Sequence, residues 1–289
     1  MMTLPEQVME ALSRAESDGH VTDRASAFEA LRRLGLEDFG LVLWNMPMTD
    51  YPRLSKFLPP MSSNDVTMRW TGNSGVALLQ QSVTFVRSCA ANYADTCGDT
   101  LRRKAILDFG CGYGRFLRLF SYFTNDLAGV DARNGSLEQS RHSGFADIVH
   151  KSDEVPASLP LAHQFDFAFA FSVFTHLNKT AALASLAALR KSVKNNGMLA
   201  MTIRPIEFWS IADSQSLANR ADEAKAMSEL HRSSGFAFRP LAGQGPQSNY
   251  GDTSLTVQWL EDNLIGWDIA GIDRSLNDPL QVYVFLKAV

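Results

Sequence analysis

The pattern of apolar and polar positions changes near Lys104. Upstream, apolar residues recur at helical spacing in three segments, which are residues 5–18, 24–34 and 76–93. Residues 45–63 contain four prolines and predict an irregular loop across a surface. We therefore predict a helical and irregular N-terminal extension at residues 1–75, followed by a domain over residues 76–289.

Downstream of Lys104, short apolar runs alternate with helical stretches. Strands are predicted at residues 105–109, 127–130, 147–151, 166–171 and 198–203, and helices at residues 115–123, 136–143 and 179–194. The last of these helices has the clearest apolar face, and Gly197 is its predicted stop. Strands that alternate with helices indicate βαβ units and a mostly parallel α/β sheet covered on both faces.

The end of the chain predicts a different kind of connection. Residues 267–272 and 281–286 are strand-like, and a short turn segment, Asn277-Asp278-Pro279, separates them. Such a short connection cannot form a right-handed parallel crossover, so the last strand is expected to run antiparallel. An open α/β sheet binds ligands at the carboxyl ends of its strands, and the informative residues are expected there.

A long connection, residues 204–249, separates the fifth and sixth predicted strands. A long insertion at the carboxyl edge of a sheet predicts a lid over an acceptor, here residues 205–253. The alternative is that its aromatic side chains pack a helix at residues 220–231 onto the sheet. The aromatic residues in and beside this segment are Phe208, Trp209, Phe236, Phe238 and Tyr250.

Composition and charge exclude several classes of protein. The 289 residues are 45% hydrophobic and 20% charged, as in globular chains, and the net charge of −4 disfavours a nucleic-acid partner. No apolar run reaches the roughly 18 residues of a membrane span, and residues 1–10 lack the pattern of a signal peptide. The three cysteines are odd in number and lack metal-ligand spacing, so we expect no metal and a cytoplasmic location.

One loop carries the clearest chemical signal. The segment Asp108-Phe109-Gly110-Cys111-Gly112-Tyr113-Gly114 follows a predicted strand and precedes a helix. Its glycines allow sharp turns and a close backbone approach to a ligand, and its amides suit an anionic group. The next predicted strand ends at Gly129-Val130-Asp131, where a carboxylate can accept two hydrogen bonds from a ribose diol.

Three interpretations of this loop remain open from its spacing. The first is a glycine-rich turn without a ligand. The second is a nicotinamide or flavin site, but the motif G-x-G-x-x-G would need a third glycine where this chain has Arg115. The third is a ligand with an ammonium group, because Asp108 would repel a pyrophosphate and attract a cation.

The same segment resembles the first motif of class I S-adenosylmethionine-dependent methyltransferases. Further segments resemble later motifs of a bacterial subgroup that is associated with small metabolites and surface sugars. These segments are residues 165–177, 189–201, 250–251 and 278–284. The family often has Gln-Asp where this chain has Gln281-Val282. The resemblance covers about residues 100–289. It implies a Rossmann-like, seven-stranded, mostly parallel α/β sheet with an antiparallel last strand, and S-adenosylmethionine as cofactor.

The resemblance also implies roles for individual residues. The loop glycines would pass the backbone along the methionine part and near the ribose of the cofactor. Asp108 would approach the methionine amine, Asp131 would hold the ribose hydroxyls, and Asp153 would contact the adenine unless it is a solvated loop acid. The implied cofactor-binding residues are Asp108, Gly110, Cys111, Gly112, Gly114, Asp131, Asp153 and Ser172. We expect Cys111 to be a small residue in a crowded turn and not a nucleophile.

Methyl transfer is an in-line displacement, whose barrier falls when the reacting atoms are aligned. A hydroxyl acceptor gains from a base, and His176, four residues after Ser172, is the candidate. The alternative is a structural histidine that caps the next helix or braces the loop. Residues 69–72 are a candidate cover for the cofactor from the N-terminal side.

We expect the acceptor to be a small hydroxylated molecule, in particular a sugar, that is methylated on oxygen. The Asn/Asp-Pro-Pro-Tyr/Phe signature of amino-methylating nucleic-acid enzymes is missing, because Ser172-Val173-Phe174-Thr175 stands in its place. Two alternatives stay open, which are a non-catalytic S-adenosylmethionine-binding regulatory or assembly partner and a nicotinamide-dependent oxidoreductase. No residue pattern indicates an oligomeric state.

Overall fold

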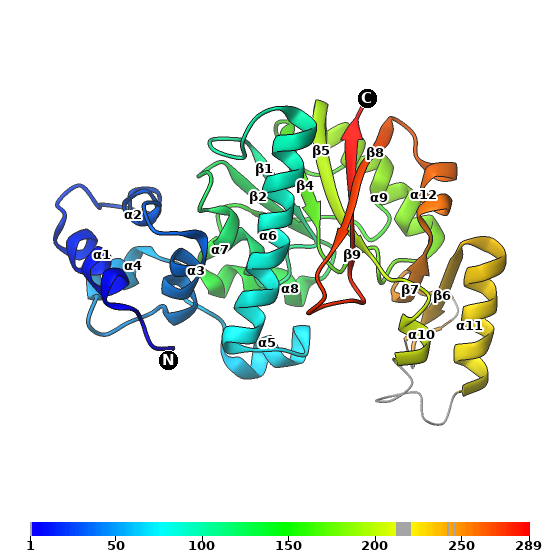
Figure 1. The fold of residues 1–289 in the computed structure, drawn as a ribbon, viewed down its shortest axis with the longest axis horizontal. Helices are drawn as coiled ribbons and strands as arrows, with labels where there is room; N and C mark the ends of the chain where they lie inside the picture. The colour runs from blue at the N-terminus through cyan, green and yellow to red at the C-terminus, as the bar shows by residue number, and fades with distance from the viewer. Residues whose placement is uncertain (1, 212–220, 242, 246) are drawn as a thin grey trace. The chain divides into compact units, whose positions relative to one another are not determined.

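The computed structural model describes residues 2–211, 221–241, 243–245 and 247–289 (Figure 1). The chain divides into two compact units. The first comprises residues 1–91 and 100–151, and the second comprises residues 92–99 and 152–289. The long helix α6 (Gly75–Cys97) has residues in both units, and it extends beyond the predicted helix at both ends.

The first unit begins with short helices, in line with the helical spacing of the N-terminal region. They are α1 (Glu6–Ser17), α2 (Arg24–Leu31), α3 (Leu36–Asn45), α4 (Pro52–Phe57) and α5 (Asn64–Thr71). A capping box starts α2, in which the Asp23 carboxylate accepts from the Ser26 amide at 2.8 Å. The prediction of an irregular stretch over residues 45–63 is wrong for α4. Pro52 lies in its first turn, where a missing amide costs no hydrogen bond.

Parallel strands and two further helices complete the first unit. They are β1 (Ile106–Phe109), α7 (Arg115–Phe120), β2 (Leu127–Asp131), α8 (Asn134–Ser140) and β3 (Val149–Lys151). Every residue of β1 and β2 is buried, as expected for strands covered on both faces. The predicted helix over residues 136–143 is wrong at its end. A wider turn, η1 (Arg141–Phe145), follows Ser140, and its Gly144 has a left-handed φ of 82°.

The second unit contains the remaining strands of the main sheet. Its elements include β4 (Phe165–Ala170), α9 (Lys179–Ser192), β5 (Val193–Ile203), β8 (Trp267–Arg274) and β9 (Val282–Ala288). Strand β4 runs parallel to β5, whereas β9 runs antiparallel to both β5 and β8. The predicted antiparallel last strand is therefore confirmed. The predicted helix stop at Gly197 is wrong, because α9 already ends at Ser192 and Gly197 lies within β5.

Gly197 has a different structural reason. A Cβ atom at this position would lie 2.8 Å from the carbonyl oxygen of Asp166, in the neighbouring strand β4. The pairing of β4 with β5 shifts register between Phe165 and Phe167, at the same level of the sheet. The glycine therefore allows a close approach of two strands, one of the uses of glycine inside a strand.

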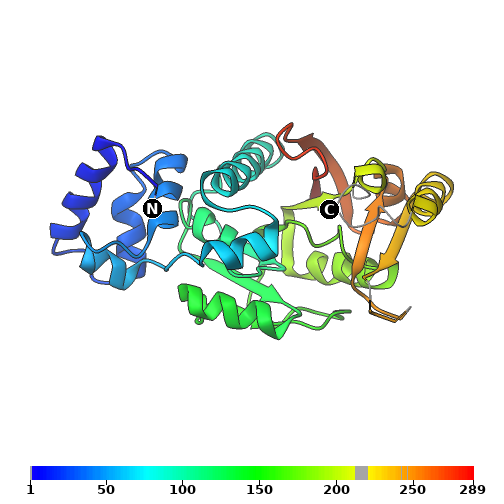
Figure 2. The same ribbon diagram turned by 90° about the horizontal axis from the view of Figure 1, so that it is seen from below.

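The insertion after β5 forms its own small substructure in the second unit (Figure 2). It contains α10 (Phe208–Ile211), α11 (Ala221–Ser234), β6 (Phe236–Pro240) and β7 (Gly251–Leu255), and α12 (Val257–Asn263) follows. Strands β6 and β7 pair antiparallel, and α11 lies beside them. The predicted helix over residues 220–231 runs from 221 to 234. Residues 212–220, 242 and 246 of the predicted lid, 205–253, lie outside the described residues.

The apolar packing of the insertion centres on the fully buried side chain of Trp209. Phe208, Trp209 and Ala237 form a buried cluster, against which Met227 and Leu280 pack. The indole nitrogen of Trp209 donates to the hydroxyl of Ser254 at 2.7 Å. These contacts give the aromatic residues at 208 and 209 a packing role, and the lid function stays a prediction.

Among the described residues, the main strands pair in the order β3-β2-β1-β4-β5-β9-β8. This is a seven-stranded, mostly parallel sheet with helices flanking it and an antiparallel last strand. The predicted α/β, Rossmann-like fold class is therefore confirmed. In the described part of the chain, no helix is long and apolar enough to cross a membrane.

Candidate active site

The glycine loop, residues 108–114, turns the chain from β1 into α7 within the first unit. Its left-handed glycines are Gly110 (φ 82°), Gly112 (56°) and Gly114 (78°). The amides of Gly110 and Cys111 both donate to the carbonyl oxygen of Val130, at 2.8 and 3.1 Å. A Cβ at Gly114 would lie 2.5 Å from Cδ2 of Phe145, so a side chain there must displace that ring. Backbone hydrogen bonds and absent side chains thus set the shape of the loop.

Asp131 lies at the end of β2 and is tied to the glycine loop. Its Oδ2 accepts from the amide of Gly112 at 3.0 Å, and its Oδ1 accepts from the amide of Arg133 at 2.8 Å. The residue is 6% exposed. An ionised carboxylate has about four acceptor positions, so two backbone bonds leave capacity for further donors. The structure thus holds a preoriented carboxylate at the position that the sequence indicates.

Asp108 is the second carboxylate of this loop, and it is 2% exposed. Its Oδ2 is buried and has no hydrogen-bond partner among the described residues. Burial, and after it repulsion from Asp131, raise the pKa of Asp108 well above its usual range, while Arg115 opposes the rise. A buried acceptor without a donor is costly, so the ionised form of Asp108 calls for a cationic donor.

Cys111 packs inside the same turn. A Cβ added at Gly129 of β2 would lie 2.9 Å from Cβ of Cys111, so the cysteine fills the space left by that glycine. Burial, and after it the Asp108 and Asp131 carboxylates, raise the pKa of the Cys111 thiol well above its usual range. A neutral, buried thiol is a poor nucleophile. These contacts favour the expected role of a small residue in a crowded turn.

Arg118, on α7, binds the backbone of the glycine loop. No sequence motif indicates this residue. It is fully buried, and its Nη1 donates to the carbonyl oxygens of Gly114 and Tyr113 at 3.0 and 3.3 Å. Its Nη2 donates to the carbonyl oxygens of Pro60 and Ser143. Burial lowers the pKa of Arg118 to about 10. The sequence signal that could reveal it is an arginine on a helix whose other positions are mainly apolar.

Trp70 of α5 packs against the glycine loop. Its ring meets that of Tyr113 edge-on, with centroids 6.2 Å apart, and the guanidinium of Arg133 lies 5.4 Å from the centre of the Trp70 ring. A Cβ at Gly112 would lie 3.8 Å from the Trp70 ring. The N-terminal region therefore contributes an aromatic side chain next to the loop, at the segment that the sequence indicates as a cover.

Other predicted site residues belong to the second unit. Asp153 follows β3 and has an exposed side chain, while the neighbouring Glu154 accepts from Nδ2 of Asn249 at 3.2 Å. Ser172 follows β4 with a left-handed φ of 57°, which is uncommon for a serine. The Ser172 amide donates to Oγ1 of Thr202 at 2.7 Å, which fixes this strained turn onto β5.

Gln281 meets the turn after β4 from the start of β9. Its Nε2 donates to Oγ of Ser172 at 3.4 Å, and Oγ of Ser172 lies 3.3 Å from Oγ1 of Thr175. The Oε1 of Gln281 is buried without a hydrogen-bond partner among the described residues. The turn thus combines hydroxyl groups with an unsatisfied amide oxygen. The sequence drew attention to position 281 through the family motif but gave it no role.

His176 has both ring nitrogens engaged. Its Nδ1 lies 2.7 Å from the carbonyl oxygen of Gly251, so Nδ1 must carry the proton and donate. Its Nε2 then accepts from Nη2 of Arg204 at 3.2 Å. The ring also stacks on Tyr250, with centroids 4.9 Å apart. A proton on Nε2 would face the guanidinium cation, so this arrangement holds a neutral imidazole.

Arg204 ties the turn after β4 to the strands of the insertion. Its Nη1 donates to the carbonyl oxygen of Thr175 and to Oδ1 of Asp252, both at 2.9 Å. The other oxygen of Asp252 accepts from Nη2 of Arg239 at 2.7 Å. Each of these three side chains is 12–15% exposed. They form one charged network at the end of β5, which we call the Arg204 network together with His176.

Comparison with known proteins gives one family match. Residues 107–201 match the model of a family described as "Methyltransferase domain". A search of curated proteins found no relative with a significant match. The matched residues include the glycine loop, Asp131, Asp153, Ser172 and His176, and the match favours methyl transfer over the nicotinamide-dependent alternative.

Solved structures also resemble the chain. An S-adenosylmethionine-dependent methyltransferase from Clostridium acetobutylicum is 10% identical, with a TM-score of 0.49 over 78% of this chain and 96% of the other. The magnesium protoporphyrin IX methyltransferase from Synechocystis with bound SAH is 15% identical, with a TM-score of 0.48 over 78% and 94%. A glycopeptide N-methyltransferase complexed with sinefungin is 11% identical, with a TM-score of 0.47 over 69% and 92%.

Proposed function

We propose that this chain is an S-adenosylmethionine-dependent methyltransferase that methylates a hydroxyl group of a small acceptor, in particular a sugar. The match of residues 107–201 to the family described as "Methyltransferase domain" supports methyl transfer. The observation that supports a hydroxyl acceptor is the polar group set after β4. Ser172 and Thr175 present hydroxyls there, and the buried Oε1 of Gln281 lacks a donor. An acceptor hydroxyl can supply that donor and be oriented by it. As its oxygen forms the bond to the methyl carbon, the sulfur would keep the electron pair of the broken carbon–sulfur bond and the hydroxyl proton would pass to solvent.

The first unit offers groups that suit S-adenosylmethionine. The unsatisfied Oδ2 of Asp108 would accept from the amine of the methionine part, and the remaining acceptor positions of Asp131 would take the ribose hydroxyls. When bound, this cofactor supplies a methyl group activated by a positively charged sulfur. The backbone at Gly110, Cys111, Gly112 and Gly114 would line it, and Trp70 would cover it. We also propose that Asp153 contacts the adenine; its side chain is exposed and therefore accessible to a ligand.

We assign His176 to positioning, the alternative that the sequence left open. A general base needs a free lone pair within reach of the acceptor proton. The one lone pair of the neutral His176 ring, on Nε2, is taken by Arg204. His176 instead links the turn after β4 to the Gly251 carbonyl oxygen at the start of β7. Through this link it would fix the turn that carries Ser172 relative to the rest of the second unit.

The lid at residues 205–253 belongs to the same proposal. Strands β6 and β7 are anchored to the turn after β4 by the Arg204 network and by the amide of Gly251, which donates to the carbonyl oxygen of His176 at 2.8 Å. Such anchoring suits an acceptor-binding wall that is built on the carboxyl edge of β4 and β5.

Because the three cysteines are free thiols, we also propose that the reaction takes place in the reducing cytoplasm.

The test is a methyl-transfer assay with labelled S-adenosylmethionine and a panel of acceptors. The panel contains free hexoses, nucleotide sugars, bulk tRNA and a protein extract, and mass spectrometry locates the methyl group. We expect an O-methyl sugar. Methylated tRNA or protein, or a methyl on nitrogen, would contradict the acceptor proposal. Tight cofactor binding without turnover on any acceptor would support the non-catalytic alternative.

Gln281→Leu sharpens the test, with Gln7→Leu on the exposed face of α1 as the matched control. Loss of the unsatisfied amide should raise the KM for the acceptor by roughly tenfold and leave the cofactor affinity unchanged. The control should change neither. An unchanged acceptor KM in the Gln281 variant would remove Gln281 from the acceptor site.

A further inference from the structure

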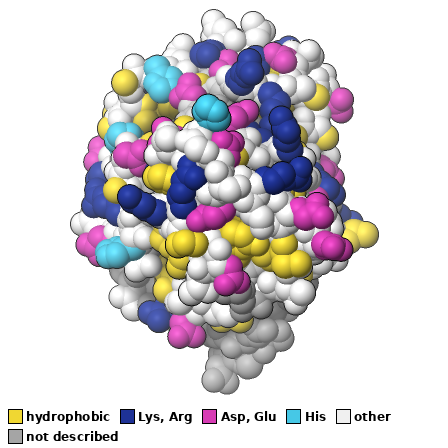
Figure 3. All heavy atoms as spheres, turned by 90° about the vertical axis from the view of Figure 1, so that its left-hand side faces the viewer, with side chains coloured by type: hydrophobic (Ala, Val, Ile, Leu, Met, Phe, Trp, Pro, Cys, Tyr) yellow, Lys and Arg dark blue, Asp and Glu magenta, His cyan; other side chains and the backbone are white. Residues whose placement is uncertain are grey.

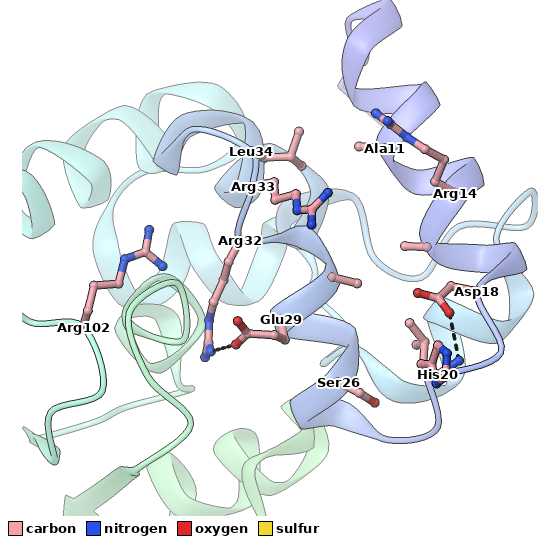
Figure 4. Close-up of a pocket in the computed structure, with 13 residues that line it drawn as sticks. Ala11, Arg14, Asp18, His20, Ser26, Glu29, Arg32, Arg33, Leu34 and Arg102 are labelled. Carbon is pink, nitrogen blue, oxygen red and sulfur yellow. Dashed lines mark hydrogen bonds and ion pairs between the residues drawn. The ribbon is translucent and has the colours of Figure 1, made fainter.

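A basic hollow in the first unit is lined by residues of α1 and α2, of the turns that follow them, and by Arg102; we call it the α1–α2 hollow (Figure 4). Its volume is about 770 Å³, within the range of small-molecule sites. Its ionisable side chains are Arg14, Arg32, Arg33, Arg102, Asp18, Glu29 and His20. Four arginines against two carboxylates give a local charge of +2 with neutral histidine, whereas the whole chain carries −4. The hollow is therefore a local concentration of positive charge on an acidic protein.

Two of these arginines already have partners. Arg32 pairs with Glu29 and donates to the carbonyl oxygen of Ser121. Arg102 donates to the carbonyl oxygen of Tyr122 at 2.8 Å, and its guanidinium lies 4.4 Å from the centre of the Tyr122 ring. Burial lowers the pKa of Arg32, and the nearby charge of Arg102 lowers it further, although Glu29 opposes both. These contacts orient the two guanidiniums on one side of the hollow.

The other two arginines are exposed and have no protein partner among the described residues. The side chains of Arg14, on α1, and Arg33, just after α2, make no hydrogen bond or ion pair among the described residues. Both line the same hollow, and Figure 4 shows them extending into the space between the two helices. Their like charges repel, and the one carboxylate of the hollow without an arginine partner is that of Asp18. An anion between the arginines would remove this repulsion and satisfy both forks.

The hollow also has an apolar wall. Ala11, Ala15, Val21, Ala30 and Leu34 line it beside the arginines. On the face that shows the N-terminal helices, Lys and Arg side chains are interspersed with acidic ones (Figure 3). An extended polyanion such as nucleic acid needs a continuous basic surface, which this face does not provide. The combination of a compact basic side and an apolar wall favours a small anion that carries an organic body.

We propose that the α1–α2 hollow binds a small organic phosphate, with its phosphate held by Arg14 and Arg33 and its body against the apolar wall. The planar guanidinium fork matches phosphate oxygens, and two unpaired forks match the double charge of a phosphate monoester. Arg102 precedes β1, whereas the glycine loop follows it, so the hollow lies at the opposite end of this strand from the loop. It is a second binding site, independent of the proposed methyl transfer.

The experiment titrates the full-length protein with phenyl phosphate, inorganic phosphate and succinate at constant ionic strength, by isothermal calorimetry. Phenyl phosphate should bind at one equivalent and more tightly than inorganic phosphate, because its ring meets the apolar wall. Succinate carries two negative charges without a phosphate and should bind more weakly than phenyl phosphate. Binding of succinate as tight as that of phenyl phosphate would overturn the phosphate assignment.

Paired variants locate the site. Arg14→Gln combined with Arg33→Gln should weaken phenyl phosphate binding on the order of tenfold or more, because two charge-assisted contacts are lost. Arg232→Gln combined with Arg274→Gln removes the same charge from exposed positions outside the hollow and should leave the affinity unchanged. Circular dichroism and Tm of both variants check folding, which neither substitution should disturb. Absent saturable binding, or equal affinity in both paired variants, would overturn the proposal.

Discussion

The glycine loop and the Arg204 network are built in opposite ways. Hydrogen bonds between backbone groups hold the loop, Gly114 leaves no space for a side chain, and the fully buried guanidinium of Arg118 donates to carbonyl oxygens of the loop. The Arg204 network is held by side chains, with a carboxylate between two guanidiniums. Substitutions that add atoms should destabilise the tightly packed glycine loop, whereas substitutions that remove a charge should disrupt the Arg204 network. Variants of the two regions should therefore lose different properties.

The largest effect is expected from Gly114→Ala. The new methyl group would overlap the Phe145 ring, and alanine would be strained at a φ of 78°. The free energy of unfolding should fall by about 2–5 kcal/mol, with loss of S-adenosylmethionine binding. Gly112→Ala is the matched control, because its φ is also left-handed but its Cβ would have ordinary contacts with Trp70. Denaturant unfolding and calorimetry measure both variants, and equal damage in the two would contradict the overlap argument.

Arg118→Met and Arg204→Met compare the two regions directly. The first removes the side-chain donor to the carbonyl oxygens of Tyr113 and Gly114, although the Gly114 oxygen keeps its bond from the backbone amide of residue 118. It should lower the free energy of unfolding by about 2–4 kcal/mol and weaken cofactor binding. The second leaves Asp252 paired with Arg239, so it should lower turnover while the cofactor affinity stays within about twofold. Calorimetry with S-adenosylmethionine decides between them. Equal cofactor affinities would show that Arg118 does not support the loop.

Asp108→Asn should bind the cofactor about tenfold to a hundredfold more weakly, because a charge-assisted contact is lost, yet be more stable at neutral pH. The folded-state pKa of Asp108 is raised above its ordinary value of 3.8, so the folded state holds a proton more tightly than the unfolded state. The contribution of protonated Asp108 to the free energy of unfolding is fully present below about pH 3.8, and it is lost as the pH rises through the raised pKa of Asp108. Asparagine does not ionise, so the free energy of unfolding of the variant does not fall in this way as the pH rises.

Thermal unfolding across this pH range checks the sign. The Tm difference between Asp108→Asn and the natural chain should increase with pH and level off above the raised pKa of Asp108. Affinity for S-adenosylmethionine in the natural chain should rise over the same window, as Asp108 ionises. A Tm difference that decreases with pH would mean that Asp108 is stabilised as the carboxylate in the folded protein.

The smallest effect is expected from His176→Asn. If His176 only positions the turn, the substitution should lower the free energy of unfolding by about 1 kcal/mol. Turnover at saturating cofactor should fall by less than about tenfold. As a general base, its loss would lower turnover by roughly 10²–10⁴-fold. The pH profile of turnover gives a second readout, because a base with a pKa near neutrality would leave an acidic limb that the variant loses. Such a limb would overturn the positioning role.

How far the sequence predicts the structure differs between the same two regions. The glycine loop is a short continuous segment, so spacing and residue type alone predict Asp108 within it and Asp131 beside it, and Asp131 does accept from the Gly112 amide. Arg118 escapes this reasoning, because its acceptors at Pro60 and Ser143 are remote in sequence and are carbonyl groups, which every residue has. The Arg204 network escapes it for a similar reason. Its Asp252 lies 48 positions from Arg204, on a strand without a clear alternating pattern.

The wrong predictions of element boundaries have local causes. Prolines predict an irregular loop over residues 45–63, and Pro59 and Pro60 do lie outside the helices, but Pro52 lies in the first turn of α4, where proline is well tolerated. Gly197 predicts a helix stop from its residue type, but glycine also serves where two strands approach closely, as it does beside Asp166. In both cases the residue type is compatible with two structures, and only the three-dimensional neighbours decide between them.

The ties between the N-terminal helices and the turn after α8 have a consequence during synthesis on the ribosome. The guanidinium of Arg24 donates to the Gly144 carbonyl oxygen and pairs with Asp147, which is 123 positions later in the chain. At roughly 5–20 residues per second, the partner follows about 6–25 seconds after Arg24 is made. For that time the first helices exist without their anchor. Slower translation of the intervening segment would lengthen their exposure, so the choice of synonymous codons between these positions should influence how much protein reaches the folded state.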